Sequence, residues 1–226
     1  MTPPLRVAEG QHPRSLEVEI QRKATLRFLL FLPQGYERSE QRWPLLLFLH
    51  GSGERGEDLD RVKVHGPPKI VQTRKDFPFV VVSPQISEGR KWDSDELLAL
   101  LDRLTPQLKI DPDRVYVTGL SMGGFGAWEL AMSAPERFAA IAPISGSGDD
   151  ERACGMKNVP VWAFHGAQDD VVALARGREI VDAVRACGGD VTFTVYPDAG
   201  HDAWTRTYEN QKLYEWLLAH RRAARE

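Results

Sequence analysis

The feature that most constrains this chain is the pentapeptide Gly119-Leu120-Ser121-Met122-Gly123, which has the pattern G-x-S-x-G. The apolar run 114–118 precedes it, and the helix-forming stretch 125–132 follows it. A serine that joins a strand to a helix in this pattern sits on a tight, strained turn with its Oγ exposed above the sheet. Only small neighbours fit beside such a turn, which explains the flanking glycines. We therefore predict that Ser121 is a nucleophile, the alternative being a glycine-rich turn with an incidental serine.

The rest of the chain alternates between predicted strands and predicted helices. Such alternation predicts an α/β fold, with a mostly parallel sheet flanked by helices. Reactive groups gather at the carboxyl ends of the strands in sheets of this kind. The predicted strands are 16–21, 26–33, 44–50, 79–83, 114–118, 139–144, 159–165 and 191–196, and the predicted helices are 97–108 with Asp93 or Ser94 as its cap, 125–132, 174–186 and 204–221.

Length and charge limit the possible organisation and partners. The 226 residues suit one α/β domain over 1–226, with 1–14 as a flexible N-terminal arm. The formal net charge of −3 leads us to expect neither a nucleic-acid partner nor a membrane partner. The longest apolar run, 45–49, is too short to span a bilayer. No secretory signal is visible, so we expect a cytoplasmic protein, although a processed secreted form would look the same. The sequence indicates no oligomeric state.

The cysteines and histidines show no metal-binding spacing. Cys154 and Cys187 are the two cysteines, too few for a disulfide framework. We expect free thiols, with a single bridge as the alternative. The chain lacks H-x-x-x-H and C-x-x-C patterns, so we expect neither a metal nor a cofactor.

A serine hydroxyl needs a base, and the base needs an orienting carboxylate. The order expected after this kind of turn is serine, acid, histidine. His201 follows the last predicted strand in the loop 197–202, so we predict that it is the base. We expect His50 and His165, which each end a buried strand, to bond to loop backbone instead. The remaining histidines lie near the termini or in a polar loop: His12, His65 and His220.

The acid should lie on the turn after the preceding strand. That strand ends at His165, and our choice on the turn is Asp169. Asp170 is the alternative, because it could instead cap a turn or helix. Asp149 and Asp150 follow an earlier strand and are weaker candidates, which we interpret as solvated loop charges.

A tetrahedral intermediate needs two hydrogen-bond donors for its oxyanion. The backbone N–H of Met122, directly after the nucleophile, is one predicted donor. The second should come from the loop after the strand that ends at His50, and we assign the N–H of Ser52. The small residues of this loop, including Gly51, let the backbone approach a substrate. They could equally make a tight turn, and both interpretations can hold together.

Four motifs occur in the order known from one superfamily: 50–56 (HGSGERG), 119–124 (GLSMGG), 165–172 (HGAQDDVV) and 200–201 (GH). Together they resemble the α/β-hydrolase superfamily. They are most similar to its small phospholipase/carboxylesterase-like and "predicted peptidase"-type serine esterases, which are related to feruloyl-esterase and polyhydroxybutyrate-depolymerase-like enzymes. The resemblance covers the chain from about Trp43 to the C-terminus, and the first motif is the most specific of the four.

The resemblance implies an eight-stranded core, a Ser121-Asp169-His201 triad and hydrolysis of small acyl esters. It also points to Gln85, Trp92 and Trp204 as substrate-binding residues, together with Gly51, although both tryptophans could simply be packing residues. Only 145–158 separates two of the predicted strands where lids are usually inserted, which is too short for a lid domain.

The sequence thus predicts a serine carboxylic-ester hydrolase that acts on small or short-acyl esters through an acyl-enzyme. A thioesterase, an acyl transferase or a serine peptidase on the same fold is the first alternative, and acceptor preference would discriminate among them. A non-catalytic binding protein is the second alternative. The three predicted triad residues argue against it, because binding requires none of them.

Overall fold

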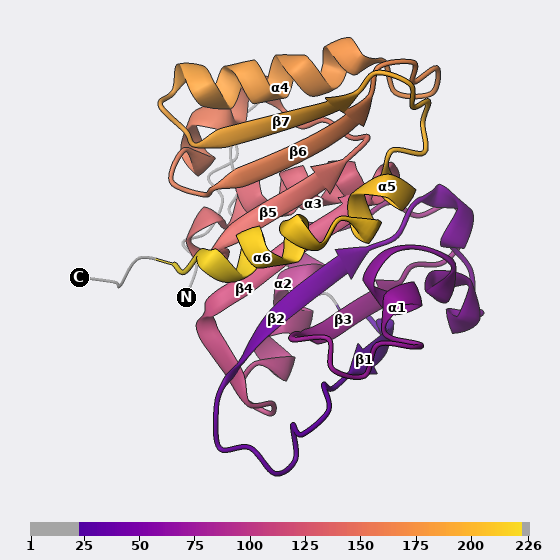
Figure 1. Cartoon of the computed structure of the whole chain (residues 1–226), viewed down its shortest axis with the longest axis vertical. Coiled ribbons are helices and arrows are strands. Elements are labelled where there is room, and N and C mark those ends of the chain that lie inside the picture. Colours follow the sequence, from indigo (N-terminus) through magenta and orange to yellow (C-terminus); the bar gives the residue numbers. More distant parts are fainter. Residues whose placement is uncertain (1–22, 223–226) are drawn as a thin grey trace, which may run out of the picture.

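One seven-stranded sheet runs through residues 23–222, the part of the chain that the computed structural model describes (Figure 1). The strand order is β1-β3-β2-β4-β5-β6-β7, and all neighbours are parallel except β1, which is antiparallel to β3. The strands are β1 (Arg27–Phe31), β2 (Trp43–Leu49), β3 (Val80–Gln85), β4 (Ile110–Leu120), β5 (Ala140–Ile144), β6 (Val161–Gly166) and β7 (Val191–Tyr196).

Helices cover both faces of this sheet. In Figure 1, α5 and α6 cross in front of the strands, and α2 and α3 lie behind them. One apolar core lies between the sheet and α2, α3 and α4, and a second lies between the sheet and α1, α5 and α6. The helices are α1 (Gly66–Ile70), α2 (Ser94–Leu104), α3 (Met122–Ser133), α4 (Leu174–Ala186), α5 (Trp204–Glu209) and α6 (Gln211–Ala219).

The central strands are buried on both faces, which explains their continuous apolar sequences. Residues 45–49 of β2 are 0% exposed, as expected for a strand between two helical layers. Six strands are predicted after residue 43. Five of them are confirmed to within two residues at each end. The strand before Ser121 is longer than predicted, because β4 begins at Ile110.

Two predictions at the N-terminus lie outside the described residues. They are the strand 16–21 and the flexible arm 1–14. The resemblance implies eight strands, and the sheet within residues 23–222 has seven. The strand predicted at 26–33 is confirmed as the shorter edge strand β1.

The prediction of one terminal helix over 204–221 is wrong, because the chain breaks this segment into α5 and α6. Asn210 lies between them with an extended backbone, and its side-chain Oδ1 accepts a hydrogen bond from the Lys212 N–H at 3.1 Å. Asparagine stabilises a helix start in this way. Apolar residues continue at helical spacing across the break, which is why periodicity did not reveal it.

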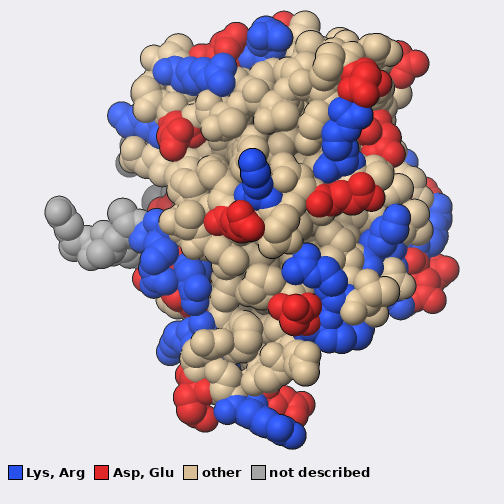
Figure 2. Space-filling view, in the orientation of Figure 1, with Lys and Arg blue, Asp and Glu red and all other residues tan. Residues whose placement is uncertain are grey.

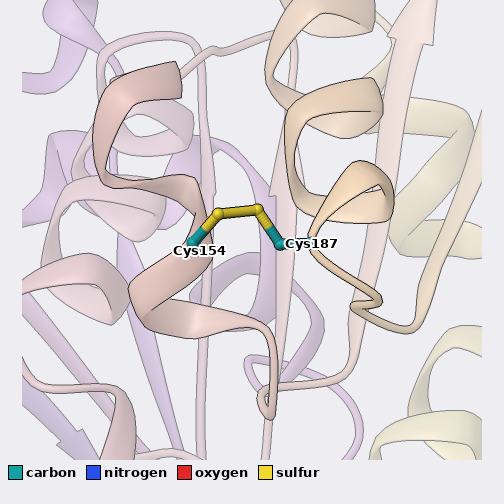
Figure 3. The surroundings of a disulfide bond; sticks show 2 residues. All are labelled: Cys154 and Cys187. Carbon is teal, nitrogen blue, oxygen red and sulfur yellow. A yellow bond between two sulfur atoms is a disulfide. The ribbon is translucent and has the colours of Figure 1, made fainter.

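The expectation of free thiols is also wrong. Cys154 and Cys187 form a disulfide that joins the 3-10 helix η4 (Asp150–Met156) to the C-terminal end of α4 (Figure 3). The two residues are 33 positions apart in sequence, and their Cα atoms lie 5.2 Å apart because η4 packs against α4. A bridge over such a loop stabilises the fold by about 3–4 kcal/mol in the chain-entropy account. Disulfides persist mainly in oxidising compartments, so this bond weighs against the cytoplasmic location, which stays a prediction.

The connection between β5 and β6 contains only η4 as regular structure, so no lid is inserted at this point. Among residues 23–222, no helix has the length and apolar character needed to cross a membrane. The predicted catalytic residues Ser121, Asp169 and His201 lie on the turns and loops that follow β4, β6 and β7.

Candidate active site

Ser121 lies on a strained turn between β4 and α3. Its backbone has φ 52° and ψ −118°, a conformation that L-residues adopt rarely and mostly at functional sites. The turn is possible because its neighbours lack side chains. A Cβ on Gly123 would lie 1.9 Å from the Leu49 carbonyl oxygen, and one on Gly119 would lie 2.3 Å from the Gly123 oxygen. The turn thus presses directly against β2 and leaves Ser121 partly exposed at the sheet edge.

The structure brings His201 to Ser121. The two atoms Ser121 Oγ and His201 Nε2 are 2.9 Å apart, and the His201 side chain is 18% exposed. His201 lies in the loop between β7 and α5. Ser145 fixes this loop, because its Oγ donates a hydrogen bond to the His201 carbonyl oxygen at 2.9 Å.

Asp169 contacts the other nitrogen of the His201 ring. His201 Nδ1 lies 2.8 Å from Asp169 Oδ2 and 3.0 Å from Oδ1, and the Asp169 side chain is fully buried. The Val171 and Val172 N–H groups also donate to Asp169 Oδ1, at 3.0 and 2.8 Å. Burial alone would raise the pKa of Asp169, but the hydrogen bonds from His201, Val172 and Val171 outweigh it and hold the pKa below its ordinary value. Asp169 is therefore ionised, and it keeps a proton on His201 Nδ1.

The other candidate carboxylates lie elsewhere. Asp170 is exposed, and among the described contacts His201 Nδ1 bonds only to Asp169. Asp149 and Asp150 are exposed too, and Asp149 caps η4 by accepting from the Glu151 N–H at 3.1 Å.

His165 contacts the turn that carries Asp169. Its Nε2 donates to the Val172 carbonyl oxygen at 2.8 Å and also lies 3.3 Å from Asp169 Oδ2. The ring is almost fully buried and packs against α4, where a Cβ on Gly177 would lie 2.6 Å from its Nδ1. The prediction that His165 bonds to loop backbone is thus confirmed. Its closeness to Asp169 was not predicted, although the spacing His165-x-x-x-Asp169 on one turn is a signal for it.

His50 orders the turn after β2. Its Nε2 accepts from the Ile86 N–H at 3.3 Å, so its Nδ1 carries the proton and donates to the Gly51 carbonyl oxygen at 2.6 Å. Burial lowers the pKa of His50 to about 4, with Arg55 and Arg61 adding to the effect and the Gly51 hydrogen bond opposing it. The neutral imidazole is therefore the form that holds this turn, and the predicted backbone bonding of His50 is confirmed.

The two predicted oxyanion donors each begin a helix. Ser52 is the first residue of the 3-10 helix η1 (Ser52–Glu54), and Met122 is the first residue of α3. The first N–H groups of a helix have no partner within it, so both can bind a substrate oxygen. The two turns are in contact, because a Cβ on Gly51 would lie 2.7 Å from the Leu120 side chain.

A cavity of about 440 Å³ opens beside Ser121. Trp92 forms one wall, as predicted, and its Nε1 donates to the His50 carbonyl oxygen at 3.1 Å. Gly126 makes room for this ring, because a Cβ there would lie 2.8 Å from Trp92 Cδ1. Phe125, which was not predicted, forms another wall; its place in the first turn after Ser121 is the signal that could have found it. The lining residues are Lys91, Trp92, Ser121, Met122, Phe125, Gly126 and Glu129.

Trp204 and Gln85 lie outside this cavity's lining. The Trp204 ring stands perpendicular to the His201 ring, with centroids 5.0 Å apart, and it lines a separate cavity of about 380 Å³ between α1 and α5. The Gln85 amide donates to the carbonyl oxygens of Glu54 and Asp58 at 2.8 and 2.7 Å. Gln85 thus holds the loop after β2 in place. Within residues 23–222, no cluster of three or more His, Cys, Asp or Glu side chains could hold a metal ion.

The fold and the family of this chain follow from its similarity to known proteins. Seven mostly parallel strands between two helical layers, with a serine on the turn after β4, are the α/β-hydrolase fold. A crystal structure of a thermostable esterase has the same fold, with a TM-score of 0.77 and 31% identity, covering 87% of this chain and 60% of that one. The dienelactone hydrolase family matches residues 18–223, and the chain belongs to this family.

Two curated relatives are esterases. The chain is 31% identical over 185 residues to the bifunctional acetylxylan esterase/xylanase XynS20E of Neocallimastix patriciarum, covering 76% of this chain and 26% of that protein. It is 28% identical over 169 residues to feruloyl esterase D of Neurospora crassa, covering 69% of this chain and 57% of that protein. The chain therefore spans between a quarter and somewhat more than half the length of these two relatives.

Proposed function

We propose that this protein is a serine carboxylic-ester hydrolase that works through an acyl-enzyme. The observation that carries the proposal is the continuous hydrogen-bonded array from Ser121 through His201 to Asp169. It lies at the carboxyl edge of the sheet, beside a cavity of about 440 Å³ that Ser121 itself lines. The esterase relatives support the same class of reaction.

In the first step, Ser121 Oγ attacks the ester carbonyl carbon as His201 Nε2 takes the serine proton. Asp169 keeps the other proton on Nδ1 and stabilises the imidazolium that forms. The carbonyl oxygen becomes an oxyanion, which the N–H groups of Met122 and Ser52 bind. His201 then gives its proton to the departing alcohol oxygen. A water molecule repeats the sequence on the acyl-enzyme and releases the carboxylic acid and free Ser121.

The cavity supports small substrates. Its volume is at the lower end of the usual range for ligand pockets, and the rings of Trp92 and Phe125 supply apolar walls. We propose short or small acyl esters as substrates and no cofactor. The face shown in Figure 2 carries acidic and basic side chains intermixed. From the net charge of the sequence, we propose that neither a nucleic acid nor a membrane is a partner.

The test is hydrolysis of p-nitrophenyl acetate together with covalent labelling by a fluorophosphonate. Ser121→Ala should remove the label and lower kcat by at least about 10³-fold without unfolding the protein. Asp169→Asn should lower kcat by up to about 10⁴-fold, because His201 loses its orienting carboxylate. Asp170→Asn is the matched control and should keep full activity, since its carboxylate is exposed. An active, pure Ser121→Ala protein would refute the proposal.

A further inference from the structure

Glu54 folds back onto the turn that carries one proposed oxyanion donor. It is the last residue of η1, and its side chain is only 13% exposed. Its Oε2 accepts a hydrogen bond from the Gly51 N–H at 2.8 Å. Its Oε1 lies 3.9 Å from His65 Nε2. The carboxylate is thus directed toward the interior of the loop, although a glutamate in a glycine-rich surface loop would ordinarily point into solvent.

The hydrogen bond between Glu54 and the Gly51 N–H affects the next peptide group along the chain, which carries the Ser52 N–H. The Gly51 carbonyl and the Ser52 N–H belong to one planar unit. His50 holds the carbonyl end of this unit at 2.6 Å, and Glu54 holds the N–H of the unit before it. Gly51 has φ −79° and ψ −176°, so these two bonds together limit rotation on either side of its Cα. They therefore determine where the Ser52 N–H points.

Packing around Gly51 restricts the same turn. A Cβ on Gly51 would lie 2.7 Å from Leu120 Cδ1 and 3.1 Å from Glu54 Oε2. The Leu120 side chain and the Glu54 carboxylate thus both lie close to the place that a side chain on Gly51 would occupy. If the carboxylate were removed, this contact and the hydrogen bond to the Gly51 N–H would be lost, and Gly51 could change its position relative to Leu120.

Other side chains hold the outer part of the loop. Arg55 Nε donates to the Ser52 carbonyl oxygen at 3.0 Å, and Arg61 donates to the Gly53 carbonyl oxygen at 2.6 Å. Both bonds lie beyond the Gly51–Ser52 peptide. Within residues 23–222, Glu54 is the side chain that bonds to the Gly51 N–H, so no described neighbour could replace this contact.

We propose that Glu54 is a positioning residue, which aims the Ser52 N–H at the developing oxyanion by holding the Gly51 N–H. The inference rests on the proposed function of the same site. Glu54 acts through the backbone, and it is the length of its side chain that matters. A misplacement of about 1 Å at a reacting site costs on the order of 10²-fold in rate. Loss of the contact should therefore lower kcat and leave KM nearly unchanged, because the donor acts in the transition state.

Two variants of Glu54 distinguish the effect of side-chain length from the effect of charge. Glu54→Gln keeps an acceptor oxygen at the same reach and loses the charge, whereas Glu54→Asp keeps the charge and is too short to reach the Gly51 N–H. Glu54→Gln should retain kcat within about 3-fold. Glu54→Asp should lose roughly 10- to 100-fold in kcat with p-nitrophenyl acetate. Its inhibition constant for phenylboronic acid, which forms a tetrahedral adduct on the serine, should rise by a similar factor.

The control is Glu57→Ala, because Glu57 lies in the same loop, is 75% exposed and pairs with Arg27. It should behave as the wild type does. The inference is overturned if Glu54→Asp keeps wild-type kcat, if Glu54→Gln is the impaired variant, or if both lose activity only through a lower melting temperature. If the wild type itself neither hydrolyses the ester nor takes the fluorophosphonate label, the proposed function fails first. An active wild type with an unaffected Glu54→Asp variant refutes this inference alone.

Discussion

Two turns at the same edge of the sheet hold the reacting groups, and they are held in different ways. The turn that carries Ser121 is fixed by backbone against backbone, since a Cβ on Gly123 would lie 1.9 Å from the Leu49 carbonyl oxygen. The turn that carries the Ser52 N–H is fixed by side chains, with Glu54 on the Gly51 N–H and His50 on the Gly51 carbonyl.

Because the two turns are held differently, we expect them to respond differently to amino-acid substitutions. Backbone atoms in the centre of a sheet cannot move away without disturbing neighbouring strands, so the serine turn should tolerate almost nothing. Side chains can rotate, so the oxyanion turn should lose its alignment gradually. We therefore expect substitutions in the serine turn to cause a large loss of stability and activity, and substitutions in the oxyanion turn to cause smaller, graded losses.

Gly123→Ala should have the largest effect. The added methyl group would overlap the Leu49 carbonyl oxygen, and overpacking against atoms that cannot yield costs about 3 kcal/mol or more. Displacement of Ser121 should also lower kcat/KM by at least about 10²-fold. Urea unfolding and ester hydrolysis measure the two effects. Gly155→Ala is the control, because nothing lies within 4 Å of its added Cβ. A Gly123→Ala protein as stable and active as this control would show that backbone contact does not fix the turn.

Low pH should lower the folding stability of the protein, because protonation of His50 disturbs the turn that carries the Ser52 N–H. Burial lowers its pKa from 6.5 to about 4, so between these values the unfolded chain binds a proton that the folded protein does not. Folding stability should therefore be fully present above about pH 6.5 and fall as the pH drops toward 4, by about 3 kcal/mol in total from this group. His50→Asn keeps a donor for the Gly51 carbonyl and does not titrate. Urea unfolding at several pH values should show a shallower slope for His50→Asn, and equal slopes would contradict this account.

Gly51→Ala should have the smallest effect, although it makes the same chemical change as Gly123→Ala. Its φ of −79° suits any residue, and its closest neighbour is the end of the Leu120 side chain at 2.7 Å. Because this side chain can move, we expect a loss of about 1 kcal/mol and a decrease in kcat of several-fold to about tenfold. Gly53→Ala, which meets nothing within 4 Å, is the control in the same turn. A loss as large as that of Gly123→Ala would remove the distinction between the turns.

The sequence was sufficient to predict the buried strands, the serine turn and the order of the triad residues, because each depends on neighbouring residues in the chain. A continuous apolar run such as 45–49 can be satisfied only between two layers, and alternation of strands with helices requires a parallel sheet. The strained serine turn requires glycines on both sides, so its position was readable from five residues. Chain order then placed Asp169 and His201 after successive strands, and the structure brings both to Ser121.

The sequence by itself thus determined the sheet, the serine turn and the order of the residues that meet there, because each depends on spacing of a few residues. Tertiary structure alone decided which distant side chains meet. The Cys154–Cys187 bridge follows from the packing of η4 against α4. The same holds for Glu54, whose sequence position is that of a solvated loop charge. Only the folded loop directs its carboxylate to the Gly51 N–H, because that contact depends on the path of the whole turn against Leu120.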